Sequence, residues 1–458
     1  MYKEDTIAAI ATPIGEGGVA IVRVSGPDAE RVAKEIFLRS GGRNGHLRSH
    51  TLHHGVVRKP ETGGIVDEVL LALMRKPRSY TGEDVVEVHC HGGPFVVRQV
   101  LELILSRGVR HAEPGEFTKR AFLNGRMDLA QAEAVLDLIR ARTEKSAQLA
   151  LQQTRGQLSK WVGELREELL DILVQIEAGI DFPEEEIELV QREELAEKIE
   201  GLRAKISGII ESYEWGRLFR EGARVCIIGR PNVGKSSLLN ALLGEERVIV
   251  TSVPGTTRDV IEEGINLDGL PVVLWDTAGI RETEDEIEKI GVDFSLRHLV
   301  EAEAALIVLD GSTSLTRQDE AILEAAGKKK SLVVVNKSDL GQNLDLAQVQ
   351  ILSQGKEMIP ISARKGEGLD LVKVRLRALL LDPQNEPPMV LTNLRHKAAL
   401  IRAESGLIRA RKALGQALPA EIVAVDLQEV KDALEDIVGM VSSEDILERI
   451  FTSFCIGK

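Results

Sequence analysis

Four residues, Gly229, Gly234, Lys235 and Ser236, have the types and the spacing that bind phosphate groups. They fit the pattern G-x-x-x-x-G-K-[ST], in which glycines allow successive backbone N–H groups to point at phosphate oxygens. The lysine of this pattern reaches the β- and γ-phosphates, and the serine hydroxyl is a ligand for Mg²⁺. An apolar run precedes the motif and a helix-forming run follows it, as the motif requires. The sequence therefore predicts that the protein binds a nucleoside triphosphate with Mg²⁺.

A second motif, Asn336-Lys337-Ser338-Asp339, follows the apolar run 332–335 and indicates which base is bound. A carboxylate at this place can accept hydrogen bonds from both N1–H and N2–H₂ of guanine, and adenine lacks this pair of donors. A site built on such a pair rejects an analogue that cannot complete it by orders of magnitude. Ser362-Ala363-Arg364 follows another apolar run and would complete the base pocket. The expected ligand is GTP.

Two further strings lie between these motifs at the places where phosphate-sensing residues are needed. Asp276-Thr277-Ala278-Gly279 follows the apolar run 272–275, so that Asp276 can hold Mg²⁺ through water and the Gly279 N–H can meet the γ-phosphate. Within Gly255–Asp259, Thr257 would be the second hydroxyl ligand of Mg²⁺. Each string is weak by itself. Five in order, each at the end of an expected strand, strongly favour a GTP-binding domain.

The residue that follows Gly279 bears on hydrolysis. Many signalling GTPases have a glutamine there that orients the attacking water, whereas this chain has Ile280, which has no polar group. The acid-rich segment 282–288 could supply a carboxylate instead, or it could be a plain solvated loop. The amide oxygen of Asn232 could help to coordinate a monovalent cation, which would neutralise charge in the transition state as an arginine finger does.

Length and composition restrict the class of protein. The chain has 458 residues, a net charge of −14 and three scattered cysteines, Cys90, Cys226 and Cys455. The length suggests about three domains. The cysteine count fits a reducing cytoplasm, and the sequence contains neither a secretory leader nor a run of apolar residues long enough for a membrane span. An acidic protein lacks a broad basic surface for binding nucleic acid. If the protein acts on RNA, we therefore expect a partner to provide most of the binding.

Hydrophobic periodicity divides the chain into four segments. Residues 1–124 mix strand-like runs with glycine pairs and predict an α+β domain. Residues 125–221 show apolar residues at three- and four-residue steps, which is typical of long amphipathic helices. Residues 222–382 alternate strands and helices as a doubly wound sheet does, and helical periodicity returns over 383–458. We therefore expect a multidomain α/β and all-α protein, with a GTPase sheet inserted into a helical domain.

Two alternatives remain open at this point. The long helices could form a bundle core or a dimer seam, and the bundle is favoured. On the expected strand 84–90, alternation places Glu87, His89 and His91 on one face, opposite Val86, Val88 and Cys90. Such a face could bind a metal, but an ordinary polar strand face is favoured because no further ligand cluster is apparent.

Beyond these motifs, the whole chain resembles the tRNA-modification GTPases of the MnmE family, also called TrmE. The resemblance lies in Tyr80–Asp84 with His91–Pro94, in Pro114–Thr118, in Asn124–Ala134 and in the terminal Phe454–Lys458. It implies that the N-terminal domain binds a 5-formyl- or methylene-tetrahydrofolate and mediates homodimerisation. Arg23, Glu87, Arg126 and Lys458 match the folate-contacting positions, where Arg126 replaces a common lysine. Cys455 matches the family's C-terminal cysteine, and its role is open.

The resemblance also implies partners and a catalytic arrangement. Proteins of this family act with the FAD-containing flavoprotein MnmG to modify C5 of the wobble uridine in certain tRNAs, adding an aminomethyl or carboxymethylaminomethyl group. Their GTPase domains pair in K⁺, so that Glu288 would orient the attacking water and Lys235 would act on the phosphates. The implied K⁺ ligands are Asn232, Thr251, Val253 and Thr256, and the implied Mg²⁺ ligands are Ser236 and Thr257. The full expected nucleotide site comprises Asn232, Val233, Gly234, Lys235, Ser236, Ser237, Thr251, Ser252, Val253, Pro254, Gly255, Thr256, Thr257, Asp276, Thr277, Ala278, Gly279, Asn336, Lys337, Ser338, Asp339, Ser362, Ala363 and Arg364.

Two functions of different classes fit the GTPase motifs. One is a GTP hydrolase that serves a tRNA-modifying complex, and the other is a GTP-dependent ribosome-assembly factor or switch that modifies nothing. A nucleotide site does not decide between them, because one fold serves many tasks. The outer domains do favour the first, since the folate positions and the Cys-Ile-Gly-Lys tail have no purpose in the second.

Overall fold

The computed structural model describes residues 4–41, 46–181, 189–248, 262–276, 298–381, 387, 389–441 and 444–458. The chain forms two compact units, each built from segments that are distant in sequence. Unit 1 comprises residues 1–136, 153–167 and 431–458, and unit 2 comprises 137–152 and 168–430. We describe each unit by itself. The four segment boundaries expected from the sequence stay predictions.

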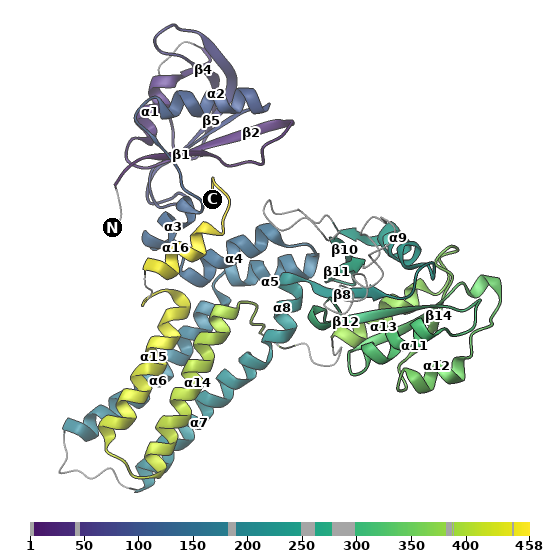
Figure 1. Cartoon of the computed structure of the whole chain (residues 1–458). Helices are drawn as coiled ribbons and strands as arrows, with labels where there is room; N and C mark the ends of the chain where they lie inside the picture. The colour runs from purple at the N-terminus through teal and green to yellow at the C-terminus, as the bar shows by residue number, and fades with distance from the viewer. Residues whose placement is uncertain are drawn as a thin grey trace. The chain divides into compact units, whose positions relative to one another are not determined.

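Unit 1 contains a seven-stranded sheet with the order β3-β4-β5-β6-β2-β1-β7 (Figure 1). Its strands are β1 (Ile7–Ile10), β2 (Gly17–Ser25), β3 (Phe37–Arg39), β4 (Leu52–Arg58), β5 (Ile65–Met74), β6 (Val85–Gly92) and β7 (Arg110–His111). All neighbours pair antiparallel except β1 and β7, which are parallel. In the β2–β6 pair, Arg23 lies directly opposite Glu87. Two of the predicted folate-contacting residues are therefore cross-strand neighbours.

Each face of this sheet has its own apolar core. Helices α1 (Ala29–Ile36) and α2 (Pro94–Leu105) bury one face, where Val86, Val88 and Cys90 are at most 2% exposed, so the predicted alternation along β6 is confirmed. On the other face, Ile7 and Ala9 of β1 pack with Phe117 of helix α3 (Glu116–Leu123) and with Tyr80. The second core is small, and it borders the candidate site described below.

A helical part completes unit 1. It contains the first residues of α4 (Leu129–Arg140) and of α6 (Gln157–Asp181), the end of α15 (Ala420–Val438) and all of α16 (Glu444–Thr452). Leu129 and Leu136 of α4 pack against Phe451 and Phe454. The end of the chain is therefore held by an apolar contact, just before the Cys-Ile-Gly-Lys tail.

Unit 2 contains the second seven-stranded sheet, with the order β14-β13-β12-β8-β11-β10-β9. The strands are β8 (Ala223–Ile228), β9 (Arg247–Val248), β10 (Glu262–Leu267), β11 (Leu270–Asp276), β12 (Ala304–Asp310), β13 (Ser331–Asn336) and β14 (Met358–Pro360). The five strands from β14 to β11 are mutually parallel, and β10 and β9 add antiparallel pairs at one edge. Parallel strands read as continuous apolar runs because both faces of such a sheet are covered.

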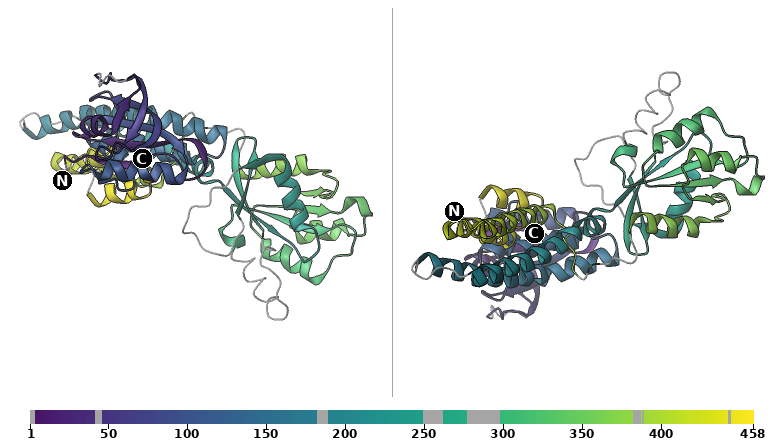
Figure 2. Two further views of the ribbon diagram at one scale, coloured as in Figure 1. Left: turned by 90° about the horizontal axis from the view of Figure 1, so that it is seen from above. Right: turned by 90° about the horizontal axis from the view of Figure 1, so that it is seen from below.

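Helices cover both faces of the second sheet, as Figure 2 shows. They are α9 (Lys235–Glu246), α11 (Arg317–Ala326), α12 (Leu346–Leu352) and α13 (Leu369–Leu380), with the short 3₁₀ helix η1 (Ser338–Leu340) after β13. Separate apolar cores lie on the two faces. The predicted doubly wound fold is thus confirmed.

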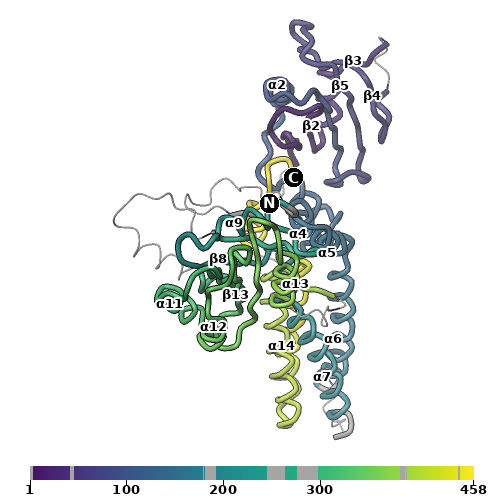
Figure 3. Tube along the Cα trace, turned by 90° about the vertical axis from the view of Figure 1, so that its right-hand side faces the viewer, coloured from purple at the N-terminus to yellow at the C-terminus, as the bar shows by residue number. Residues whose placement is uncertain are grey.

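The other described helices of unit 2 are α5 (Glu144–Thr154), α7 (Leu189–Glu211), α8 (Tyr213–Glu221) and α14 (Leu394–Gly415), beside parts of α4, α6 and α15 (Figures 1 and 3). Helix α14 packs along α7. Leu195, Ile199, Leu202 and Ile206 of α7 are at most 3% exposed, which confirms the predicted helical periodicity. The bundle interpretation is favoured, since these side chains are buried within one chain. Among the described residues, no helix is both long and apolar enough to cross a membrane.

Candidate nucleotide site and N-terminal cationic cluster

The phosphate-binding loop connects β8 to α9, and two of its glycines are required by its geometry. Gly234 has φ +100°, and a Cβ at this residue would lie 2.3 Å from Nδ2 of Asn336. A Cβ at Gly229 would lie 2.5 Å from the backbone oxygen of Val308. A Cβ at Gly229 would therefore clash with backbone, and one at Gly234 would displace the buried Asn336 amide from a backbone conformation that residues with side chains rarely adopt. Asn232, with φ +61°, adopts the left-handed region that asparagine tolerates better than most residues.

The side chain of Lys235 closes the loop by bonding to backbone oxygens of the loop. Its Nζ donates to the backbone oxygens of Gly229 at 2.9 Å and Arg230 at 3.1 Å. These bonds hold the ammonium group at the mouth of the loop, beside the N-terminus of α9. The positive charge and the N-terminus of the helix together favour an anion there. Ser236 and Ser237 follow in the first turn of α9.

The base-reading motif is attached directly to this loop. Asn336, 3% exposed, donates from Nδ2 to the Val233 oxygen at 2.8 Å and accepts from the Ala363 N–H at 3.0 Å. Lys337 donates to the Asn232 oxygen at 2.8 Å. One asparagine and one lysine therefore fix the three predicted motifs relative to one another. The structure brings together the loop, Asn336–Asp339 and Ser362–Arg364, as the sequence predicts.

Asp339 has the state that guanine recognition requires. Its Oδ1 accepts a hydrogen bond of 2.8 Å from the Ser362 hydroxyl. This bond lowers the pKa of the Asp339 carboxyl below its usual range, and the nearby charges of Lys365 and Arg364 lower it further. The carboxylate is therefore ionised at neutral pH and acts purely as an acceptor, which suits the two donors of the guanine edge.

Sequence reasoning missed Asp310, the last residue of β12. Its Oδ2 lies 2.6 Å from Nζ of Lys337, and Oδ1 accepts a hydrogen bond from Ser312. Burial by itself would raise the pKa of Asp310, but these hydrogen bonds outweigh it and lower the pKa. Asp310 holds Lys337 in place beside the loop. The sequence did contain one signal for Asp310. It directly follows an apolar run, as the other motifs do, and parallel strands bring such residues to the same edge of the sheet.

Several predicted residues lie outside the described residues. These are Thr251, Ser252, Val253, Pro254, Gly255, Thr256, Thr257, Thr277, Ala278, Gly279 and Glu288. Asp276 is the last residue of β11, and its backbone pairs with Ile227 near the end of β8. Strand order thus brings Asp276 to the same sheet edge as the phosphate-binding loop.

A second polar site lies in unit 1, around the β2–β6 pair. Nε of Arg23 donates to Oε1 of Glu87 at 2.8 Å, and both side chains are less than one fifth exposed. The Arg23 guanidinium carbon lies 5.3 Å from the ring centre of Tyr80 and 5.7 Å from that of Phe117. Two aromatic faces therefore enclose a paired arginine, an arrangement that stabilises a cation where water is scarce.

The C-terminal tail contacts the same place. Gly457 has φ +99°, and its backbone oxygen accepts from Arg23 at 3.3 Å. The Phe117 N–H donates to the backbone oxygen of Lys458 at 3.2 Å. Nζ of Lys458 lies 5.9 Å from the Tyr80 ring centre, and burial, together with the charge of Arg23, lowers the pKa of this ammonium group. Lys458 thus adds a second cation beside Arg23.

Arg126 borders the same segment of chain, since its Nε donates to the Ser79 oxygen at 3.1 Å. It also lines a cavity of about 470 Å³ within unit 1, whose other walls include Met127, Gln131, Val162 and Glu435. Arg23, Glu87 and Lys458 are therefore brought together around Tyr80, and Arg126 adjoins them through Ser79. We call Arg23, Glu87, Arg126 and Lys458 the cationic cluster. Their side chains carry three positive charges and one negative charge, which favours an anionic ligand.

The side chains on the polar face of β6 are engaged by protein groups. Glu87 is engaged by Arg23, and Nδ1 of His91 lies 2.7 Å from Asp67. Nε2 of His89 lies 3.5 Å from Glu87. Across the described parts of the chain, no group of three His, Cys, Asp or Glu residues is arranged to hold a metal ion.

The three cysteines differ in environment. Burial raises the pKa of the Cys90 and Cys226 thiols to about 11, so both are protonated at neutral pH. Cys455, in the tail, is exposed. If a cysteine of this chain takes part in chemistry, Cys455 is the accessible one.

The parallel sheet, the phosphate-binding loop and the Asn336–Asp339 motif define a P-loop GTPase. Comparison with known proteins makes this class specific. Residues 129–455 match the MnmE helical domain, and residues 6–126 match the GTP-binding protein TrmE N-terminus. This chain belongs to the MnmE family.

Full-length relatives agree with this assignment. A protein of Natranaerobius thermophilus called tRNA modification GTPase MnmE is 46% identical, covering 99% of this chain and 100% of its own. A protein of the same name from Carboxydothermus hydrogenoformans is 48% identical over the same shares. A solved structure of a single-residue variant of Aquifex aeolicus Era, bound to GDP·AlF₄⁻, is 32% identical, covers 40% of this chain and 66% of its own, and has a TM-score of 0.28.

Proposed function

We propose that this protein hydrolyses GTP and, with a flavoprotein partner, modifies C5 of the wobble uridine in certain tRNAs. The added group would be aminomethyl or carboxymethylaminomethyl, and a 5-formyl- or methylene-tetrahydrofolate would supply the one-carbon unit. The observation that carries the proposal is the presence, in one chain of the MnmE family, of a guanine-reading phosphate site and a separate cationic cluster. A protein that acts only as a GTP-dependent switch needs the nucleotide site but not the cationic cluster.

In the GTPase site, this chain's residues divide the work of binding and hydrolysis. The backbone of Asn232–Ser237 and the Lys235 ammonium group would bind the phosphates, and Asn336 and Asp339 would bind guanine. Ser236 and Thr257 fit Mg²⁺, since hydroxyl oxygens suit this ion. Bound Mg²⁺ neutralises charge that develops on the phosphates. Glu288 would orient the attacking water, a task that Ile280 cannot perform.

A monovalent cation would complete the charge balance during hydrolysis. Asn232, Thr251, Val253 and Thr256 would bind K⁺, the last three from a segment outside the described residues. Support comes from Asn232, whose strained φ of +61° turns the loop where its amide could face a phosphate-bound cation. In this proposal the GTPase sites of two copies of the chain pair when both bind nucleotide, and pairing raises the rate.

The cationic cluster would hold the folate. Arg23, Arg126 and Lys458 supply positive charge for carboxylates, and Glu87 can accept from the donor groups of a pteridine ring. Tyr80 and Phe117 offer aromatic faces. Flavin chemistry would belong to the partner protein. Because the chain has a net charge of −14, we propose that the partner supplies most of the grip on tRNA, and that two copies of this chain form a homodimer in the cytoplasm.

The alternative is a GTP-dependent assembly factor that modifies no RNA. It shares the nucleotide site but leaves the cationic cluster and the exposed Cys455 without a task. A defect confined to these residues therefore separates the two functions.

Mass spectrometry of nucleosides from bulk tRNA tests the proposal. Cells that lack the gene are complemented with the wild-type chain, with Arg23→Gln or with Cys455→Ser. The matched control is Arg31→Gln, an exposed arginine of unit 1 outside the cluster. We expect a 5-aminomethyl-type uridine to be lost on deletion and restored by the wild type and by Arg31→Gln only. Unchanged tRNA nucleosides after deletion would contradict the proposal and favour the assembly factor.

A further inference from the structure

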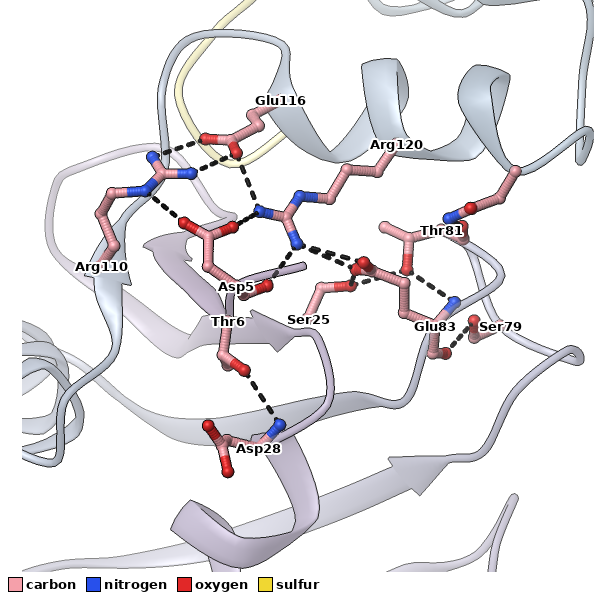
Figure 4. Close-up of polar contacts among 11 residues, drawn as sticks. Asp5, Thr6, Ser25, Asp28, Ser79, Thr81, Glu83, Arg110, Glu116 and Arg120 are labelled. Carbon is pink, nitrogen blue, oxygen red and sulfur yellow. Dashed lines mark hydrogen bonds and ion pairs between the residues drawn. The ribbon is translucent and has the colours of Figure 1, made fainter. Parts of the chain in front are cut away.

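Arg120, on helix α3, is a charged side chain that is only 3% exposed (Figure 4). Its NH1 donates to the backbone oxygen of Asp5 at 2.7 Å and to Oε1 of Glu83 at 3.1 Å. Its NH2 donates to Oδ1 of Asp5 at 2.5 Å and to Oε1 of Glu116 at 3.0 Å. One guanidinium thus joins three carboxylates from three parts of unit 1. Removing one partner of such a group leaves buried charge uncompensated.

A second arginine contacts two of these carboxylates from the outer side. Arg110, with a side chain 38% exposed, donates from Nε to Oδ2 of Asp5 at 2.8 Å and from NH1 to Oε2 of Glu116 at 3.0 Å. Burial by itself would raise the pKa values of Asp5 and Glu116, but the bonds from the two arginines outweigh it and lower them. Asp5 and Glu116 therefore each accept hydrogen bonds from both arginines. Glu83 accepts a hydrogen bond from Arg120. Arg120 differs from Arg110 in its deeper burial, in its bond to the Asp5 backbone oxygen and in its contact with Glu83, and the last of these connects it to the segment 79–83.

Glu83 ends the segment 79–83, which is fixed at several points. Ser25 donates to Oε2 of Glu83 at 2.6 Å and lies 2.6 Å from the Thr81 hydroxyl. Asn124, at the end of α3, donates to the Thr81 backbone oxygen at 2.8 Å. Figure 4 shows Arg120, Glu83 and Ser25 in one continuous set of contacts. Residues 79–83 are therefore held from two sides, by Ser25 of β2 and by Arg120 and Asn124 at α3.

The same segment carries Tyr80, which forms a wall of the cationic cluster. Its ring lies against Arg23 and Lys458 at the distances given above, and its hydroxyl lies 2.8 Å from that of Thr118 on α3. Burial raises the pKa of Tyr80, so the ring carries a neutral phenol. Because Tyr80 and Glu83 share one short segment, a displacement of Glu83 would shift the Tyr80 ring relative to Arg23.

We propose that Arg120 is a positioning residue. By holding Glu83, it fixes the segment 79–83 and thereby places Tyr80 against Arg23 and Lys458, which sets the affinity of the cationic cluster for its anionic ligand. The identity of that ligand as a folate rests on the proposed function. The positioning itself rests on the contacts of Arg120, Glu83 and Tyr80. Helix α3 is suited to this role, because one rigid element supplies both Thr118 and Arg120.

The test compares Arg120→Gln with Arg110→Gln in the full-length protein, using (6S)-5-formyltetrahydrofolate as the probe in calorimetric titrations. Both variants disturb Asp5 and Glu116, so Arg110→Gln is the matched control. We expect Arg120→Gln to weaken binding by about tenfold or more, and Arg110→Gln by less than about threefold, since residues of one hydrogen-bonded network typically couple by a factor of about ten. Arg120→Lys, which keeps the charge but not the fork of donors, is expected to lie between them.

A double-mutant cycle separates positioning from a general loss of structure. If Arg120 acts through Tyr80, then Arg120→Gln costs little additional affinity in a Tyr80→Ala background, while its effect on the melting temperature persists there. An equal loss of affinity in both backgrounds, or an Arg110→Gln effect as large as that of Arg120→Gln, would overturn the proposal. If Arg120→Gln does not fold, the cycle is run with Arg120→Lys and judged by the same criteria.

Failure of the proposed function gives a different result. If the wild-type protein does not bind the folate, the assignment of the ligand is wrong, and amide hydrogen exchange then decides the positioning by itself. Arg120→Gln should speed exchange at residues 81–83 more than Arg110→Gln does. Equal exchange at these residues in the two variants would overturn the positioning role.

Discussion

At the scale of single residues, Asp339 links the base pocket to the rest of the nucleotide site. Ser362 donates to one of its oxygens, and the lowered pKa keeps it an acceptor at neutral pH. The contacts of the neighbouring Asn336 and Lys337 hold the motif against the phosphate-binding loop. The residues expected to select the base and those expected to bind phosphate are therefore joined by a few side chains.

Asp339→Asn should exchange guanine selectivity for xanthine selectivity. The amide replaces an acceptor by a donor, which cannot pair with the guanine N2–H₂ group but can pair with the carbonyl of xanthine. A charged hydrogen bond is worth about 1.5–3 kcal/mol, so kcat/KM for GTP should fall by about tenfold to a hundredfold. Rates with GTP and xanthosine triphosphate measure this exchange.

The matched control for this substitution is Asp370→Asn, a 97% exposed carboxylate in the same unit. It should leave both rates unchanged. Asp339→Asn with undiminished preference for GTP would show that another group reads the base.

Residue motifs were the part of the site that the sequence predicted best. The loop and Asn336–Asp339 are short, local strings whose chemistry depends on spacing, and the structure joins them as expected. Asp310 was missed because its contact with Lys337 spans 27 positions. That contact exists only because β12 and β13 are parallel neighbours. A short sequence motif does not show which strands lie next to each other in the sheet.

At the scale of elements, the β8–α9 connection shows how a backbone conformation becomes a binding site. Gly234 lies at φ +100° just before α9 begins, and Asn336 approaches it from β13. The loop is therefore shaped from both sides, by its own turn and by a neighbouring strand. Its close contacts leave no room for a side chain.

Gly234→Ala should abolish nucleotide binding while leaving the sheet folded. The added Cβ would lie 2.3 Å from Nδ2 of Asn336, and the left-handed conformation would cost roughly 1–3 kcal/mol for a residue with a side chain. We expect at least a hundredfold loss of affinity for a fluorescent guanine nucleotide, with an unchanged far-ultraviolet circular dichroism spectrum.

Gly244→Ala is the control within the same helix, because a Cβ there meets no atom within 4 Å. It should bind nucleotide normally and stabilise α9 by about 0.5–1 kcal/mol, since alanine is the better helix former. Equal binding by the two alanine variants would contradict the geometric argument.

Elements were predicted more reliably than their arrangement. The expected strand 84–90 and the apolar runs 272–275 and 332–335 all became strands, namely β6, β11 and β13. Alternation in β6 correctly separated its buried and polar faces. The pairing of β2 with β6, which places Arg23 opposite Glu87, joins residues 64 positions apart. Periodicity gives the faces of a strand but says nothing of its neighbours.

At the scale of the whole molecule, K⁺ dependence tests whether pairing of two copies activates hydrolysis. No glutamine follows Gly279, so we expect slow turnover that rises in K⁺ and not in Na⁺ at equal ionic strength. If two copies must pair, the specific rate in K⁺ should also increase with protein concentration. Equal rates in the two salts would contradict the role of the cation.

Asn232→Gly is the informative variant for this prediction. Glycine tolerates the φ of +61°, so the loop keeps its shape while the amide oxygen is removed. The Lys337 contact to the backbone oxygen of residue 232 is retained. Loss of K⁺ stimulation with unchanged nucleotide affinity is expected.

Hydrophobic periodicity did not predict the contact between the C-terminal tail and β2. Arg23 and the Gly457 oxygen are separated by 434 positions, yet they share a hydrogen bond. The chain achieves this because α4, near the start, and Phe451 and Phe454, near the end, share one apolar core. The resemblance to the MnmE family suggested that Arg23 and Lys458 act together, and composition alone gave no sign of it.

The division into two units predicts separate responses to two ligands. Ligands stabilise only the unit that binds them, by about 2.7 kcal/mol at a concentration one hundred times Kd. The nucleotide motifs lie in unit 2 and the cationic cluster in unit 1. In scanning calorimetry, GDP with Mg²⁺ should therefore raise one transition, and (6S)-5-formyltetrahydrofolate the other.

Helices α6 and α15 each contribute residues to both units. These continuous helices could make the two units unfold together. The apolar cores within each unit are nevertheless distinct, and they provide most of the stabilising burial. We therefore expect the units to unfold in separate steps, with the continuous helices breaking near the boundary. A single transition that both ligands raise equally would mean that α6 and α15 couple the units into one cooperative structure. In that case each ligand would raise the melting temperature of the whole chain, because both would bind the one folded state that unfolds in a single step.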